Sequence, residues 1–169
     1  MAEQSSHHEP ERAREWFDAA DPATGDVGLR FSCTQCGNCC SGPPGYVIVD
    51  DAEVAALAAE IGIGVESFRE TYCQSTFLGL SLKEKDSPAG FDCIFLDRRS
   101  VPGKAVCSVY AARPAQCRAW PFWPAMVRSE DGWNQGKRTC PGMGKGELHA
   151  PAEIRMVRAT IEGRLDPAR

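Results

Sequence analysis

Four cysteines occur within eight residues near the start of the sequence. Cys33, Cys36 and Cys39 follow one another at intervals of three, and Cys40 is adjacent to the last of them, in the stretch FSCTQCGNCCSG. Thiolate sulfur is the ligand that zinc and iron-sulfur clusters prefer, and this spacing in a tight loop lets successive sulfurs face one centre. Because glycine and asparagine between the thiols favour a turned, polar backbone, the stretch predicts a metal site rather than a packed core.

The adjacent pair Cys39 and Cys40 raises the question of how many centres the loop serves. Neighbouring residues generally project their side chains in different directions, so the two thiols are not expected to bind one small ion together. We therefore expect a branch point, where one loop supplies ligands to two centres or to two corners of a larger cluster. A tetrahedral zinc ion needs sulfur atoms about 3.8 Å apart and a cubane cluster holds them farther apart, so the spacing fits either.

Five further cysteines are spread over the rest of the chain. Cys73 follows a predicted helix, has no second thiol near it in sequence, and is interpreted as a buried packing residue outside the site. The other four join the loop in a predicted set of eight metal ligands: Cys33, Cys36, Cys39, Cys40, Cys93, Cys107, Cys117 and Cys140. An odd total of nine cysteines, in a chain without a secretory pattern, disfavours a disulfide framework.

The composition limits the partners and the location of the protein. The chain has 169 residues and a formal net charge of -4, so attraction to nucleic acid or to an anionic membrane surface is not expected. It contains no run of about 20 apolar residues, which a membrane span would need. The first residues lack the cationic and then apolar pattern of a secretory signal. We therefore expect a cytoplasmic protein that binds neither nucleic acid nor membranes.

The sequence predicts one domain between two flanking segments. Residues 1–26 are expected to form a flexible arm with a short helix that starts at Pro10, and the nearby His7 and His8 are left out of the site. Residues 27–149 form the cysteine-cluster domain that binds metal. Residues 150–169 are expected to form a C-terminal helix, because apolar residues recur at helical spacing from Ile154 to Leu165.

Strands and helices alternate within the predicted domain. A strand is expected at residues 46–49, helices at residues 51–61 and 65–72, and an antiparallel meander over residues 77–84, 91–97 and 105–110. A helical turn follows Arg113-Pro114, and the segment from there to Gly146 is expected to be a loop folded over the site. The predicted fold class is α+β: a small irregular metal-stapled domain with a short antiparallel sheet, a few helices and long cysteine-bearing loops.

Several of these segments together resemble one known family. FSCTQCGNCC, the strand CIFL, the segment CSVYAARPAQCRAWPFW and a late Cys-Pro-Gly are similar to the YkgJ-type cysteine-cluster family, which carries a zinc- or iron-chelating domain with a CxxCxxCC signature. The resemblance spans about residues 31–142 and implies that the eight cysteines above are the family's cluster cysteines. A similar domain occurs in flagellin lysine N-methylases with an iron-sulfur centre, which implies a link to methyl transfer.

The first functional hypothesis is a metal- or iron-sulfur-cluster-binding module with eight cysteine thiolates. It would hold one 4Fe-4S cluster and one zinc ion, or two zinc ions, for electron transfer, metal handling or support of a partner enzyme. Arg113 and Arg118 bracket Cys117 and are expected to offset the negative charge of the thiolates around the cofactor. We expect an unidentified protein as the partner.

The alternative hypothesis is an iron-sulfur-dependent, methylase-like enzyme that acts on a polypeptide. No His, Asp or Glu in the cysteine segments is placed as an obvious general base, so the sequence leaves enzymatic activity undecided. A zinc-ribbon-like nucleic-acid binder is a third class, and the acidic balance and the lack of a basic stripe disfavour it.

Overall fold

Short helices and strands make up the computed structural model, which describes residues 14–162. His7, His8, the expected helix start at Pro10, and Leu165 lie outside the described residues. The helical elements are η1 (Trp16–Asp18), η2 (Asn38–Cys40), α1 (Asp51–Ile61), α2 (Val65–Tyr72), α3 (Ala115–Arg118), α4 (Pro124–Val127), α5 (Glu130–Thr139) and α6 (Pro151–Glu162). The strands are β1 (Leu29–Phe31), β2 (Ser41–Gly42), β3 (Cys73–Thr76), β4 (Gly79–Leu82), β5 (Glu84–Ser87), β6 (Gly90–Cys93), β7 (Leu96–Asp97), β8 (Val106–Cys107) and β9 (Met143–His149).

The strands form several small antiparallel sheets in the described part of the chain. The three-stranded sheet has the order β2-β6-β5, and β3-β4, β7-β8 and β1-β9 are pairs. The predicted meander is therefore present as separate short sheets rather than as one sheet. Together with the helices, these sheets confirm the predicted α+β class of small irregular domain.

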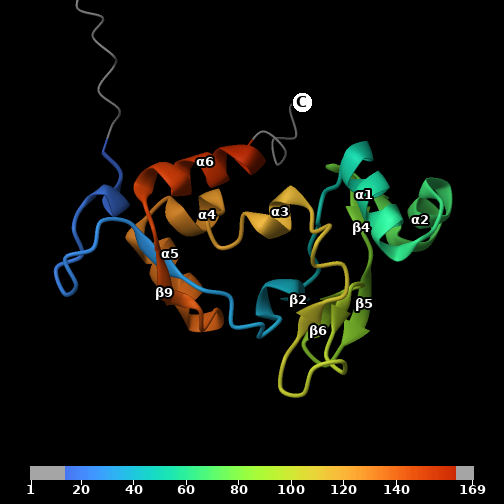
Figure 1. Cartoon of the computed structure of the whole chain (residues 1–169), viewed down its shortest axis with the longest axis horizontal. Coiled ribbons are helices and arrows are strands. Elements are labelled where there is room, and N and C mark those ends of the chain that lie inside the picture. Colours follow the sequence, from blue (N-terminus) through green and yellow to red (C-terminus); the bar gives the residue numbers. More distant parts are fainter. Residues whose placement is uncertain (1–13, 163–169) are drawn as a thin grey trace, which may run out of the picture.

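The elements gather around two hydrophobic cores, with α3 and β2 between the two groups (Figure 1). The first core lies among α1, α2, β3, β4 and the chain beyond β6, and its buried residues are Val49, Val54, Leu57, Ala58, Phe68, Cys73, Leu82, Phe95 and Val109. The Phe95 ring stacks on both Phe68 and Tyr72, at centroid distances of 6.0 and 5.1 Å. These contacts join α2 to the segment that carries Cys93.

The second core combines the two ends of the described chain. Its buried residues are Phe17, Leu29, Phe122, Val127, Trp133, Cys140, Met143 and Ile154. The Phe122 and Trp133 rings stack with their centroids 6.1 Å apart. β1 pairs with β9, with Leu29 opposite His149, so this core depends on contacts between residues more than a hundred positions apart.

Residues 15–18 pack onto this second core, where the sequence suggests a loosely held arm, whereas residues 19–25 are exposed. Phe17 is buried, and the Trp16 Nε1–H donates a hydrogen bond to the Val127 carbonyl at 2.6 Å. Glu15 and Asp18 form ion pairs with Arg155 of α6. The predicted domain boundary at residue 26 stays a prediction. Within the described residues, the expected short helix of this arm is the single turn η1.

The prediction of a loop up to Gly146 is wrong, because this segment contains α4, α5 and most of β9. The Ser129 side chain accepts a hydrogen bond from the Gly132 N–H and caps α5. Only Trp133 and Gly136 of that helix are buried. The two glycines inside the helix, Gly132 and Gly136, lower its intrinsic helix propensity and made the segment resemble a loop.

The expected strand at residues 46–49 is also absent as a regular element. Ile48 forms an isolated bridge with Ser81, and the Val49 N–H donates to the Leu80 carbonyl at 2.9 Å. On the other edge, the Gln116 side chain accepts from the Ile48 N–H and donates to the Tyr46 carbonyl. A buried side-chain amide thus takes the hydrogen bonds that a neighbouring strand would take.

Candidate metal centre

The loop from Cys33 to Cys40 is held in a tight conformation by its own backbone. Gln35 and Gly37 both have positive φ angles, of 57° and 77°. The Gly37 carbonyl accepts hydrogen bonds from the Cys40 N–H at 2.9 Å and from the Ser41 hydroxyl at 3.0 Å. A Cβ atom at position 37 would lie 2.6 Å from the Ala105 Cβ, so glycine is required where the loop meets the chain before β8.

Six cysteine side chains from distant segments line one cavity of about 100 Å³. They are Cys33, Cys39 and Cys40 from the loop, Cys93 at the end of β6, Cys107 at the end of β8, and Cys117 in α3. Apolar side chains of the first core, including Leu82, Phe95 and Val109, form much of the remaining wall. All nine cysteines of the chain are free thiols, so no disulfide competes for them.

The side chains of the adjacent Cys39 and Cys40 do not point in different directions, contrary to the expectation from the sequence. The Sγ atoms of Cys39 and Cys40 lie 3.7 Å apart, and both side chains line the same cavity. The pair sits where the η2 turn changes to extended chain at Ser41, so the alternation of a regular strand does not apply to it. Its separation matches the sulfur spacing of about 3.8 Å around a tetrahedral zinc ion.

Two of the eight predicted ligands do not line this cavity. Cys140 is buried in the second core, and Cys36 is half-buried in the loop. The loop nevertheless touches the segment around Cys140, because the Asn38 side chain donates to the Thr139 carbonyl at 2.6 Å. The Ser32 N–H donates to the Gly142 carbonyl at 3.3 Å.

Cys73 lies away from these thiols. It is buried in the first core, at the start of β3, and it does not line the cavity. Burial raises the pKa of the Cys73 thiol, so this side chain is held in the protonated form that packs as a small apolar group.

The thiols around the cavity differ in their tendency to ionise. The hydrogen bond with Cys40 lowers the pKa of Cys39 to about 7, and the positive charge of Arg113 contributes to this. The pKa of Cys40 is raised, mainly by the same hydrogen bond and secondly by burial. Burial is also the main cause that raises the pKa of Cys117 to about 12, and it raises the pKa values of Cys93 and Cys107. Several thiolates can therefore coexist here only when a bound cation compensates their charge.

The two predicted cofactor-binding arginines occupy different positions. Arg113 lines the cavity, and its guanidinium group lies over the Tyr110 ring at 3.7 Å from the centroid. Arg118 is exposed and donates to the Arg113 carbonyl, and it does not line the cavity. Arg113 can thus offset thiolate charge directly, whereas Arg118 contacts the backbone that carries Arg113.

An ion pair beside the loop was not assigned a role from the sequence. Asp92 is buried, and its carboxylate accepts hydrogen bonds from Arg98 at 3.0 and 3.1 Å. Arg98 also donates to the Ser41 hydroxyl. These contacts lower the pKa of Asp92 to about 2, chiefly through the Arg98 hydrogen bond. The pair joins the residue after Cys40 to the residue before Cys93, a link that no spacing in the sequence indicates.

The cavity thiols are too widely spaced as a set to enclose one small ion. Among residues 14–162, no group of three or more His, Cys, Asp or Glu side chains is close enough to hold a metal ion. The 3.7 Å contact between Cys39 and Cys40 is a two-residue contact within a wider ring of donors. The donor chemistry of the cavity fits zinc or iron.

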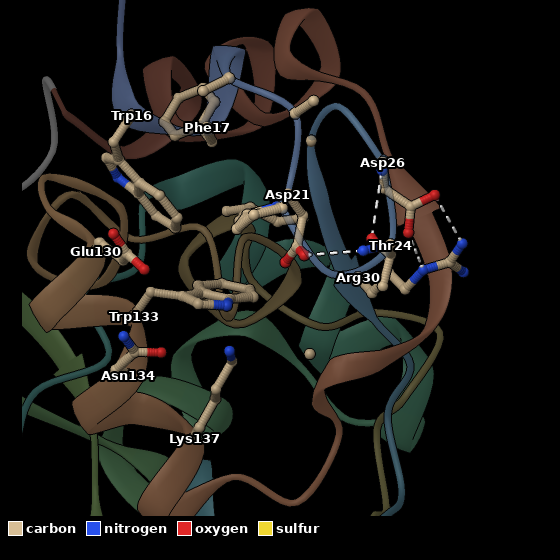
Figure 2. A pocket seen from close by; sticks show the side chains of 16 residues that line it. Trp16, Phe17, Asp21, Thr24, Asp26, Arg30, Glu130, Trp133, Asn134 and Lys137 are labelled. Atoms are coloured by element: carbon tan, nitrogen blue, oxygen red, sulfur yellow. Dashed lines mark hydrogen bonds and ion pairs between the residues drawn. The ribbon is translucent and has the colours of Figure 1, made fainter.

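A second cavity, of about 220 Å³, lies beside the second core and contains no thiol (Figure 2). Two of its three carboxylates are already engaged: Asp21 accepts hydrogen bonds from the backbone N–H groups of Ala23 and Thr24, and Asp26 pairs with Arg30 at 2.6 Å. Trp16 and Trp133 form an aromatic wall on the opposite side. This cavity offers no comparable set of metal ligands.

The comparisons with known proteins agree with the cysteine chemistry at a coarse level. No solved structure matches the chain. None of the helices in residues 14–162 has the length and apolar character needed to cross a membrane. A family model named CxxCxxCC, described as "Putative zinc- or iron-chelating domain", matches residues 32–141, which include the loop and all of the cavity cysteines. The chain therefore belongs to the CxxCxxCC family of zinc- or iron-chelating domains, which confirms the resemblance seen in its sequence.

Proposed function

We propose that this protein is a metal-binding module in which cysteine thiolates hold an iron-sulfur cluster that exchanges electrons with a protein partner. The observation that carries the proposal is the convergence of six thiols, from four separate segments, on one cavity. Unpaired thiols scattered through a core would each be packed separately among aliphatic side chains, as Cys73 is.

An iron-sulfur cluster is favoured over a single zinc ion by the spacing of the donors. No three candidate ligand side chains in residues 14–162 lie within the reach of one ion, although six thiols line the cavity. Inorganic sulfide bridges let a cluster span wider separations, with one cysteine at each iron. Zinc remains the competing occupant, because the Cys39 and Cys40 sulfurs lie at a tetrahedral spacing.

The exposure of the loop supports a role in electron exchange. Cys33 and Cys39 are exposed, whereas Cys93, Cys107 and Cys117 are partly covered. When bound, an iron-sulfur cluster supplies one-electron transfer. Arg113 stands at the same cavity and provides positive charge there. One side of the centre would thus reach the protein surface, where a partner can approach.

Anaerobic purification followed by analysis of iron, zinc and sulfide tests this function. We expect iron and sulfide in the purified protein, with the broad visible absorbance of sulfide-to-iron charge transfer and a change of that spectrum on reduction with dithionite. Zinc without iron would support a structural zinc module instead. A protein that retains neither metal, and takes up neither on reconstitution, would contradict metal binding.

Single alanine substitutions identify the cysteines that hold the centre. Cys117→Ala and Cys93→Ala should lose most of the bound metal, because they remove donors at the covered side of the cavity. Cys73→Ala is the matched control and should retain the wild-type metal content. Cys36→Ala and Cys140→Ala test the other two members of the predicted set of eight. Metal loss in these two variants would indicate a second centre beside the cavity.

A further inference from the structure

One residue that lines the cysteine cavity has a buried polar atom without a partner in residues 14–162. The indole Nε1 of Trp120 is buried, and no atom among residues 14–162 accepts a hydrogen bond from it. Leaving a buried N–H without an acceptor is unfavourable, because the group loses its hydrogen bond to water and gains none in return. Buried polar groups in folded proteins are otherwise almost always paired, so an acceptor for this atom is expected.

The neighbouring tryptophan at the same cavity is satisfied. The Trp123 Nε1–H donates to the Gln116 carbonyl at 2.8 Å, and the rings of Trp120 and Trp123 meet edge to face at 5.1 Å. Both side chains line the cavity. The two indoles therefore differ in one respect that matters here, which is the presence of an acceptor for the N–H.

The surroundings of Trp120 suggest which acceptor is missing. The cavity wall consists mainly of apolar side chains and the six cysteines, and Trp120 follows the lining residue Cys117 by three positions. Sulfur is thus the prevalent side-chain acceptor in the cavity. Thiolates and bridging sulfides carry negative charge and accept N–H hydrogen bonds, which are one of the means by which proteins adjust iron-sulfur centres.

We propose that the Trp120 Nε1–H donates a hydrogen bond to a sulfur atom of the metal centre and thereby raises its reduction potential. The inference rests on the proposed function and makes Trp120 a positioning and tuning residue for it. Reduction adds negative charge to the centre, so a hydrogen bond to sulfur stabilises the reduced form more than the oxidised form. Removal of the donor should shift the potential to a more negative value.

The main experiment compares Trp120→Phe with Trp123→Phe in the reconstituted protein. Metal and sulfide contents are measured first, and the midpoint potential is then determined by a redox titration followed in the visible spectrum. Trp120→Phe should keep the wild-type metal content and titrate at a more negative potential. Trp123→Phe removes an indole whose N–H is already bonded elsewhere, so it should keep the wild-type potential.

A second measurement uses only the wild-type protein, in case Trp120→Phe fails to fold. Protein with nitrogen-15-labelled tryptophan is reconstituted with iron and sulfide, and the indole N–H signals of the oxidised, loaded protein are followed by nuclear magnetic resonance. The Trp120 signal should have the downfield shift and slow solvent exchange of a hydrogen-bonded N–H. A signal typical of an unbonded N–H would overturn the inference, including the case in which the N–H only faces the Trp123 ring.

The remaining outcomes separate this inference from the proposed function. If wild type binds the cluster and Trp120→Phe has the same potential, the inference is wrong and the function stands. An equal shift in both variants would assign the effect to packing and would also overturn it. If wild type takes up no metal of either kind, the proposed function fails, and this inference fails with it.

Discussion

The two hydrophobic cores of the molecule are built in different ways. The first core uses one stretch of chain, from about Val47 to Val109, in which successive helices and hairpins pack on their neighbours. The second core joins residues 16–31 to residues 120–157, through the pairing of β1 with β9 and the ion pairs of Glu15 and Asp18 with Arg155 of α6. A core made of local contacts forms readily, whereas contacts between distant segments form only after a long loop has closed, which lowers the chain entropy.

The cysteine cavity lies where these two regions meet. Cys93 and Cys107 pack against the first core, while Trp120 packs against the second. A bound metal centre would therefore connect a region that folds locally to one that depends on distant contacts. The comparison implies that the second core relies more on the metal than the first.

Metal removal should give the largest effect. A structural metal contributes about 10 kcal/mol or more to the stability of small domains, so chelation should destabilise the second core more than the first. Trp16, Trp120 and Trp133 pack in or on the second core, so tryptophan fluorescence reports on that region. We expect fluorescence to change at a lower urea concentration than far-ultraviolet circular dichroism in the stripped protein, and at the same concentration in the loaded protein. Identical transitions in both samples would remove the distinction between the cores.

Alanine substitution within each core should have the next largest effect. Leu57→Ala in the first core and Ile154→Ala in the second both remove fully buried side chains, at an expected cost of about 2–5 kcal/mol each. In the metal-loaded protein, each variant should lower one shared unfolding midpoint. In stripped protein, Leu57→Ala should affect only the circular dichroism transition. A selective effect in loaded protein would contradict coupling through the metal.

Loss of the Asp92–Arg98 ion pair should lower the stability by a smaller amount, and the effect should be confined to the side of the first core. Arg98→Ala leaves the Asp92 carboxylate buried without its main partner, so we expect a loss of about 1–3 kcal/mol and weaker metal retention. Arg99→Ala is the matched control, because Arg99 is an exposed neighbour and its loss should change stability by less than about 0.5 kcal/mol. Urea unfolding of the two loaded variants measures the difference. Equal unfolding midpoints for the two variants would mean that the Asp92–Arg98 pair does not stabilise the cysteine loop.

The smallest expected effect is a pH dependence of the second core. The Arg155 hydrogen bond lowers the pKa of Asp18 below its usual 3.8, so the pair stabilises the folded state above that pH. The contribution is lost as the pH falls through the lowered pKa. Asp18→Asn should remove this contribution, at a cost of less than about 1 kcal/mol at neutral pH. Its stability deficit should disappear at low pH, and a deficit that persists at low pH would contradict the assignment.

The same difference between the cores explains what could be predicted from the sequence. In α1, Asp50 accepts from the Glu53 N–H at the start and Gly62 adopts a left-handed conformation at the end, and such local signals are visible in the residues themselves. The expected helix at residues 65–72 is α2. By contrast, β9 contains four charged or glycine residues in a row and becomes a strand only because β1 lies beside it. Propensity could not predict a pairing that depends on the other end of the chain.

The candidate site shows the same division between local and distant information. Cysteine spacing predicted the loop, and the family match includes it. Trp120 and the Asp92–Arg98 pair could not be assigned to the site in this way. They lie beside it because distant segments pack together, and residue spacing carries no information on such packing. The common direction of the Cys39 and Cys40 side chains depends on the end of a single turn, which the sequence does not specify.

The position of Cys117 has a consequence for how the protein is made. Synthesis delivers the loop cysteines first, and about half of the chain follows before Cys93, Cys107 and Cys117 have all left the ribosome. Trp120 and Trp123, which close the cavity, emerge directly afterwards. The nascent chain thus exposes a thiol-rich loop before its binding site is complete, and a metal centre that uses all of these cysteines could form only after Cys117 has emerged.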